Sequence, residues 1–211
     1  MTKAAPAATK RRVGLFGGSF DPVHKGHVAL ARLARDELDL DEVRWVPVWQ
    51  PWQKARRLAS AADREAMVRI AIEGEPRFVL ERSELRRRGT SYTLDTVREL
   101  AAAEPDVEWY LILGQDQYAG LHTWRDWREL VKFVTLVIAP RAGAAPIDPQ
   151  VAGTPHRSIA LPPMPQSSTD IRALIAAGQP IDAMVPSGVA SYIERHHLYR
   201  PGVTRDPNAR S

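Results

Sequence analysis

Two histidines, His24 and His27, stand three residues apart in the stretch GGSFDPVHKGH, which begins with Gly17 and Gly18. Glycines after an apolar run allow a ligand to approach the backbone, and they are also common in simple turns. The histidines could donate hydrogen bonds to a phosphate at a helix N-terminus, bind a metal ion, or cap a helix. The phosphate interpretation is favoured, because a catalytic zinc would need a third ligand and no HExxH pattern is present.

Two further stretches combine polar side chains with a predicted helix start. Ser167, Ser168 and Thr169 precede Arg172, which lies one helical turn past the predicted cap. Arg172 could therefore reach an anion bound at this helix start, or it could be an ordinary exposed arginine. Residues 114–116, GQD, follow the most hydrophobic predicted strand and are compatible with a turn and a helix N-cap.

These residues must be positioned by elements that the hydrophobic pattern predicts. We expect strands at 13–17, 43–48, 77–80, 109–113, 135–139 and 158–161, and helices at 26–38, 63–72 (capped by Asp63), 93–103, 126–131, 169–177 and 188–196. Short apolar strands that alternate with helices predict an α/β fold, a doubly wound, Rossmann-like parallel sheet with flanking helices. Ligands of such sheets bind beyond the carboxyl ends of the strands, which is where the candidate residues lie.

The composition limits the other possibilities. The chain has 211 residues and a net charge of +4, and we expect a tail at 1–12, one domain at 13–199 with a small C-terminal helical part, and a tail at 200–211. The absence of cysteine excludes disulfides and thiol nucleophiles. Without a membrane-length apolar run or a secretory signal, we expect a soluble cytoplasmic protein. The dispersed basic residues lack interleaved aromatics, so we expect no nucleic-acid partner.

The stretch from Gly17 to His27 resembles the signature of the nucleotidyltransferase superfamily that carries an H-x-G-H motif. Residues 167–172, SSTDIR, are similar to the S-S-T-x-[IL]-R motif of the same superfamily. The resemblance implies direct in-line transfer, with His24, His27 and Arg172 as the catalytic residues and with Mg²⁺ arriving with ATP rather than in a protein metal site. It further implies an ATP site formed by Gly17, Gly18, Ser19, Phe20, Gly26, Gly114, Asp116, Ser167, Ser168 and Thr169.

The remaining motifs resemble those of bacterial nicotinate-mononucleotide adenylyltransferases, over about residues 13–199. They are G-x-D at 114–116 with Trp124 after it, S-Y-T-x-x-T at 91–96, and the ending VPSGVASYIERHHLY. The resemblance implies transfer of AMP from ATP to nicotinate mononucleotide, which gives deamido-NAD and pyrophosphate. Asp116 would hold the adenosine part, and the implied acceptor-binding residues are Lys54, Tyr92, Thr93, Trp124 and Arg125.

One segment departs from that family. Pro51-Trp52-Gln53-Lys54 stands where members commonly have P-P-H-K, so Gln53 replaces a histidine and the role of that histidine is in doubt. Trp49 and Trp52 could form a wall of the site or pack within a loop. Nicotinamide mononucleotide and pantetheine phosphate are alternative acceptors, and a non-catalytic nucleotide-binding module is an alternative function. The sequence leaves the oligomeric state open, a homo-oligomer included.

Overall fold

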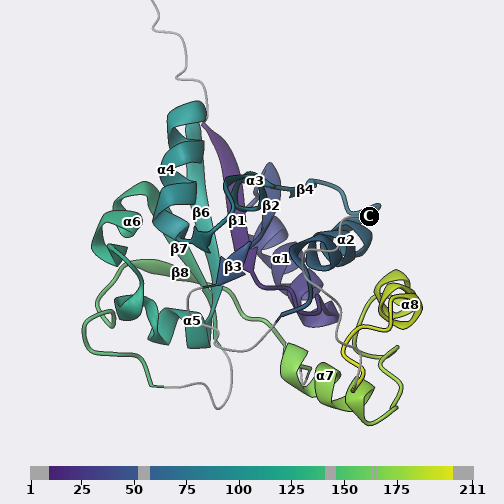
Figure 1. The fold of residues 1–211 in the computed structure, drawn as a ribbon. Helices are drawn as coiled ribbons and strands as arrows, with labels where there is room; N and C mark the ends of the chain where they lie inside the picture. Colours follow the sequence, from purple (N-terminus) through teal and green to yellow (C-terminus); the bar gives the residue numbers. More distant parts are fainter. Residues whose placement is uncertain (1–9, 52–57, 141–145, 163, 165, 202–211) are drawn as a thin grey trace, which may run out of the picture.

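Six parallel strands form one sheet in the order β4-β2-β1-β6-β7-β8 (Figure 1). The computed structural model describes residues 10–51, 58–140, 146–162, 164 and 166–201. The strands of this sheet are β1 (Arg11–Gly18), β2 (Glu42–Pro47), β4 (Phe78–Leu80), β6 (Val107–Gly114), β7 (Val134–Ala139) and β8 (His156–Ser158). The predicted doubly wound, Rossmann-like parallel sheet is confirmed.

Helices cover both faces of this sheet (Figure 1). They are α1 (Lys25–Glu37), α2 (Ala61–Ile72), α3 (Ser83–Arg87), α4 (Thr93–Ala103), α5 (Gln115–Ala119), α6 (Trp127–Phe133), α7 (Ser168–Ala176) and α8 (Ser187–Arg195), together with the 3₁₀ helix η1 (Leu121–Thr123). Two short strands, β3 (Gln50–Pro51) and β5 (Thr90–Ser91), pair in parallel outside the main sheet. The six predicted helices are all present, and each of their ends lies within two residues of the prediction.

Three details of the prediction are wrong. Helix α2 is capped by Ser60, whose hydroxyl accepts a hydrogen bond from the Asp63 N–H at 3.0 Å, so Asp63 lies inside the first turn. Strand β8 ends at Ser158, because this edge strand is fully exposed and the apolar residues that suggested a strand follow it. Strand β1 begins at Arg11, inside the predicted tail, because residues 11 and 12 pair with β6.

Successive side chains of the central strands point to opposite faces of the sheet, so the strands contribute to two hydrophobic cores. Phe16 of β1 and Ile112 of β6 pack with α1, α2, α7 and α8. Leu15 of β1 and Leu111 of β6 pack on the opposite face with α4, α5 and α6. Because helices cover both faces of the sheet, the connecting loops lie along the edge formed by the carboxyl ends of the strands.

The strand order reverses between β1 and β6. The chain runs outward from β1 through β2 to β4, and it then returns to β6 and continues outward on the other side. The register pairs Leu15 with Leu111, so the last residues of the two strands, Gly18 and Gly114, lie at the same edge. Such a reversal leaves a crevice beyond the strand ends, which is the usual ligand site of a doubly wound sheet.

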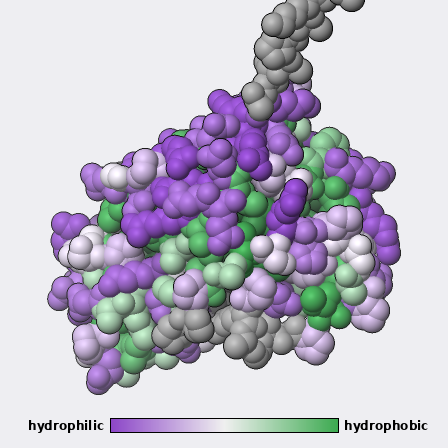
Figure 2. All heavy atoms as spheres, turned by 180° about the vertical axis from the view of Figure 1, so that it is seen from behind, coloured by the Kyte–Doolittle hydropathy of each residue, from purple (hydrophilic) through white to green (hydrophobic). Residues whose placement is uncertain are grey.

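The surface seen in Figure 2 is mostly hydrophilic, with hydrophobic residues gathered in small groups. The exposed large hydrophobic residues Val79, Phe133 and Ile147 belong to three separate segments of the chain. Isolated apolar side chains of this kind are normal on a protein surface. Within the described part of the chain, no helix is both long and apolar enough to span a membrane.

Candidate active site

The loop after β1 folds back over the end of its own strand. A Cβ atom on Gly18 would lie 3.0 Å from the Phe20 ring, whereas one on Gly17 would meet nothing within 4 Å. Phe20 has a φ of 47° and is only 1% exposed, because its ring packs against Phe16 and Trp45. Gly18 is therefore needed for the close packing of the loop, and Gly17 leaves its side of the backbone open.

The two histidines lie at the start of α1, as predicted. His24 is the N-cap residue with an extended backbone, and its N–H donates to Nδ1 of His27 at 3.1 Å. The two rings stack with their centroids 3.6 Å apart. A Cβ atom on Gly26 would lie 3.1 Å from Nδ1 of His24, so the glycine makes room for this stack.

The hydrogen bond from His24 fixes the tautomer of His27. Because Nδ1 of His27 accepts this bond, the proton of the neutral ring is on Nε2. Nε2 is then the donor nitrogen of the ring. A helix N-terminus already attracts anions, and an imidazole N–H beside it adds a second donor. The geometry therefore suits a phosphate oxygen.

Helix α7 begins against the same loop, although 146 residues of sequence separate them. The Ser168 hydroxyl donates to the Pro22 carbonyl at 3.0 Å, and Nη1 of Arg172 donates to the Asp21 carbonyl at 2.7 Å. Ser167 caps the helix by accepting from the Asp170 N–H at 3.1 Å. The predicted neighbourhood of the two motifs is thus present, with Arg172 beside the loop that carries the histidines.

Two buried groups that the sequence analysis missed also hold this loop. Arg64 of α2 is 1% exposed and donates to four main-chain carbonyl groups, those of Ser19 (3.1 Å), Val48 (2.6 Å), Trp49 (2.8 Å) and Ala59 (3.1 Å). A signal for Arg64 exists in the sequence, because it shares the helix face of the buried residues Met67, Val68 and Ala71.

The second missed group is the fully buried carboxylate of Asp21. Its Oδ1 accepts from the Ala59 N–H at 3.1 Å and from the Tyr199 hydroxyl at 2.8 Å. Burial, together with the charge of Asp21, raises the pKa of the Tyr199 phenol well above its usual value. Nothing in the sequence pattern links Tyr199 to this loop, because 178 residues separate the two.

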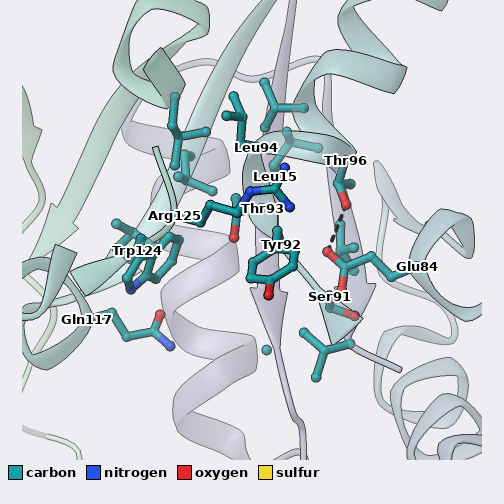
Figure 3. A pocket seen from close by; sticks show the side chains of 18 of the residues that line it. Leu15, Glu84, Ser91, Tyr92, Thr93, Leu94, Thr96, Gln117, Trp124 and Arg125 are labelled. Carbon is teal, nitrogen blue, oxygen red and sulfur yellow. Dashed lines mark hydrogen bonds between the residues drawn. The ribbon is translucent and has the colours of Figure 1, made fainter. Parts of the chain in front are cut away.

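A cavity of about 120 Å³ lies beside the end of β1 (Figure 3). Its wall includes Gly17, Gly18 and Ser19 from the loop, and Tyr92, Thr93, Trp124 and Arg125 from the predicted acceptor set. Tyr92 is the N-cap of α4 and Thr93 its first residue, so the N–H groups of Thr93 and Leu94 have no earlier helical carbonyl to bond, whereas the Asp95 N–H donates to the Tyr92 carbonyl. The guanidinium group of Arg125 lies 4.7 Å above the Tyr92 ring and 3.6 Å from the Asp95 carboxylate.

The other predicted residues lie outside this cavity wall. Gly114 is the N-cap of α5, and Asp116 stands in its first turn at the end of β6; Gln117 is the residue of this helix that lines the cavity. The histidines and the start of α7 lie along the loop that leads away from the cavity. Trp49 packs with Arg88, 5.8 Å from its ring centroid. Lys54, Gln53 and Trp52 lie outside the described residues.

One more missed residue is Glu84 of α3, a carboxyl group that lines the cavity and is 5% exposed. Burial raises its pKa, and the nearby hydroxyl groups of Ser91 and Thr96 oppose this effect. Among the residues described, no three His, Asp or Glu side chains cluster in a way that could hold a metal ion.

Comparison with known proteins places the chain in a family. A family model described as cytidylyltransferase-like matches residues 15–174. The chain belongs to the cytidylyltransferase-like family. The matched range contains the glycine–histidine loop, the residues that line the cavity and the start of α7, whereas Tyr199 lies outside it.

Relatives within this family are similar over nearly their whole length. A protein of Methylibium petroleiphilum named "Probable nicotinate-nucleotide adenylyltransferase" is 50% identical over 202 residues, which cover 92% of this chain and 95% of that protein. A Bordetella avium protein of the same name is 45% identical over 198 residues, with 90% and 99% covered. The Plasmodium falciparum nicotinic acid mononucleotide adenylyltransferase complexed with NaAD has a TM-score of 0.73 at 19% identity, with 90% and 97% covered. This structural likeness shows the shared fold.

Proposed function

We propose that this protein is an adenylyltransferase that transfers AMP from ATP to nicotinate mononucleotide, giving deamido-NAD and pyrophosphate. The observation that carries the proposal is the convergence of three features at one edge of the sheet. They are the histidine pair at the start of α1, the start of α7 with Arg172, and the cavity at the start of α4. The names of relatives that are 40–50% identical support the same reaction.

The chemistry requires little of the protein beyond positioning. A phosphate oxygen of nicotinate mononucleotide attacks the α-phosphorus of ATP, and the bond to the bridging oxygen breaks as pyrophosphate leaves with the electron pair. The attacking phosphate is already an anion, so no general base is needed. The barrier comes from bringing anions together and from the charge on the departing pyrophosphate, which fixed donors can neutralise.

We assign this neutralising role to His24, His27 and Arg172. His27 offers Nε2–H because its Nδ1 is occupied by the backbone of His24. Arg172 lies beside the loop through its bond to the Asp21 carbonyl, and its second guanidinium nitrogen is 3.1 Å from the Thr169 hydroxyl. A phosphate at the start of α7 would compete with these neutral acceptors for the guanidinium group, since charge-assisted bonds are stronger.

We propose the remaining ATP-binding residues because they lie at the same edge of the sheet. Phe20 would act through its backbone, because its ring is buried. The set comprises Gly17, Gly18, Ser19, Phe20, Gly26, Gly114, Asp116, Ser167, Ser168 and Thr169.

The acceptor is proposed to bind in the cavity. Trp124 is half-buried there and offers an aromatic face to a pyridine ring, while the N–H groups of Thr93 and Leu94 at the start of α4 suit a carboxylate. Tyr92, Thr93 and Arg125 complete the proposed acceptor site, and Lys54 is proposed to contact a phosphate. A carboxylate accepts hydrogen bonds on both oxygens, whereas an amide directs its NH₂ group toward these donors. We therefore expect nicotinate mononucleotide to be preferred over nicotinamide mononucleotide.

We expect Mg²⁺ to act with ATP and to neutralise charge on its phosphates. Mg²⁺ prefers oxygen ligands and commonly binds through substrate phosphates and water. The imidazole nitrogens of His24 and His27 suit phosphate oxygens better than this ion, so the donor set at the loop fits a Mg²⁺–ATP complex held by its phosphates.

The test is pyrophosphate release from ATP with a panel of acceptors: nicotinate mononucleotide, nicotinamide mononucleotide and pantetheine phosphate. Efficient release with nicotinate mononucleotide and formation of deamido-NAD would support the proposal. A higher kcat/KM with either other acceptor would assign a different adenylyltransferase, and ATP binding without release on any acceptor would indicate a non-catalytic module. A cytoplasmic location and the absence of a nucleic-acid partner stay predictions.

A further inference from the structure

The Glu84 carboxyl group lies in the cavity wall, and its two oxygens differ in their hydrogen bonding. Its Oε1 accepts from the Thr96 hydroxyl at 2.9 Å, and the same hydroxyl oxygen accepts from Nη2 of Arg87 at 2.7 Å. Oε2 is buried and has no hydrogen-bond partner of normal geometry among the described residues. Figure 3 shows the carboxyl group beside Ser91 and Thr96, across the Tyr92 ring from Trp124.

The surroundings of Glu84 favour its neutral form. The side chain is 5% exposed, and burial raises the pKa of its carboxyl group. The groups that oppose this rise come from four elements: Arg87 on α3 itself, Thr96 on α4, Ser91 on β5 and Arg64 on α2. When the group is protonated on Oε2, it becomes a donor, and when it is ionised it places a negative charge in the cavity wall.

We infer that Glu84 is a specificity-determining residue, whose neutral carboxyl group admits an anionic ring substituent to the cavity and whose ionised form disfavours it. This inference rests on the proposed function. The proposed acceptor would bring its own carboxylate to the start of α4, and Thr96 and Tyr92 belong to the same helix start as that site. Two carboxylates in one confined cavity repel, whereas nicotinamide mononucleotide carries an uncharged amide at this position and is spared the repulsion.

The size of the effect follows from Coulomb's law. At a separation of ~10 Å and an effective dielectric constant of ~20, the repulsion between two unit charges corresponds to roughly a tenfold change in affinity. The Arg125 guanidinium group lines the same cavity and offsets part of this charge. We therefore expect the preference for nicotinate over nicotinamide mononucleotide to fall by up to about tenfold when Glu84 ionises.

The experiment measures kcat/KM for both mononucleotides at saturating Mg²⁺–ATP, from about pH 5 to about pH 9. The ratio of the two values removes every titration that the substrates share, including those of their phosphates and of the histidines. In the wild type, the ratio should fall as pH rises. In Glu84→Gln, which stays neutral, the ratio should stay at the low-pH level of the wild type.

A matched control is Glu99→Gln, because Glu99 is an exposed carboxylate that pairs with Arg87 at 2.9 Å and lies outside the cavity wall. This variant should keep the pH dependence of the wild type. A second variant, Thr96→Val, removes the hydroxyl that stabilises the ionised carboxylate. It should shift the fall of the ratio to higher pH, which a purely structural role would not do.

The outcomes separate this inference from the proposed function. A ratio in the wild type that does not change with pH, or a Glu84→Gln ratio that falls as in the wild type, would overturn the inference while the adenylyltransferase activity stands. Failure to use either mononucleotide at any pH would overturn the proposed function instead. If Glu84→Gln does not fold, the wild-type profile and the direction of the Thr96→Val shift decide the question.

Discussion

The bond between Tyr199 and Asp21 offers the sharpest test of how the loop with the proposed catalytic histidines is held. Tyr199 follows α8, and its hydroxyl donates to Oδ1 of Asp21 at 2.8 Å. Asp21 is fully buried and stands three residues before His24. In Tyr199→Phe the carboxylate keeps its bond from the Ala59 N–H but loses the phenol donor. We expect this variant to fold, with its loop less firmly held.

Loss of this bond should lower both the free energy of unfolding and kcat. A hydrogen bond to a charged group contributes about 1.5–3 kcal/mol, so the free energy of unfolding should fall by roughly that amount. If about 1.4 kcal/mol of this energy holds the histidines in their reactive positions, kcat should fall by about tenfold. The KM for nicotinate mononucleotide should change little, because Tyr199 is not part of the cavity wall.

A pH dependence gives an independent check on the same contact. Burial and Asp21 raise the pKa of the Tyr199 phenol in the folded state above its unfolded value of about 10. The folded state then holds the proton more tightly, so this stabilisation is complete below about pH 10 and is lost as pH rises above it. Urea unfolding at pH 8 and above pH 10 should show a steeper alkaline loss for the wild type than for Tyr199→Phe.

Tyr192→Phe is the matched control. The Tyr192 hydroxyl donates to Oδ1 of Asp63 at 3.0 Å, so the variant also removes a bond between a phenol and a carboxylate, but one that lies on α2 rather than in the loop. It should lose stability and keep its kcat. The reasoning is refuted if the two variants lose similar stability and Tyr199→Phe turns over as fast as the wild type.

Three further predictions address the loop itself. His27→Ala should lower kcat by about 10²–10³ with the fold retained, as removal of one transition-state donor typically does; near-normal steady-state turnover would contradict the assignment. Gly26→Ala should lower kcat, because the added Cβ would lie 3.1 Å from the His24 ring and crowd it. Gly17→Ala places its Cβ where nothing lies within 4 Å. That variant should keep the melting temperature of the wild type and raise the KM for ATP. EDTA should abolish activity and Mg²⁺ in excess should restore it, and activity that survives chelation would exclude the proposed role of the ion.

Local signals account for the parts of the site that the sequence predicted. The glycines at the end of β1, the histidines at the start of α1 and the serine cap of α7 each depend on residues within a few positions of one another. The six main helices have enough residues for a periodic apolar face, and the strands form short apolar runs. The order of the sheet then follows from the handedness of the crossovers, which places all strand ends at one edge.

Long-range contacts account for the parts that the sequence did not predict. Arg64, Asp21 and Tyr199 come together only in the folded chain, where Arg64 and Asp21 are buried and Tyr199 is partly buried. Glu84 lies on α3, whose five residues are too few for a periodic pattern. The same holds for the two-residue strands β3 and β5 and for the short helix α5, which were not predicted. Short elements draw their stability from packing rather than from propensity.

The number of anchors on the loop has a physical reason. An enzyme that uses no general base depends on the placement of its donors, and a loop alone places side chains less accurately than a helix or strand does. Here α2, α7 and the C-terminal segment each bind the loop through Arg64, Ser168 or Tyr199. Two of these three bonds end on main-chain carbonyls and the third on the buried Asp21, so they fix the backbone of the loop that carries the proposed catalytic histidines. On the proposed mechanism, Tyr199 would therefore support catalysis without contacting the substrate.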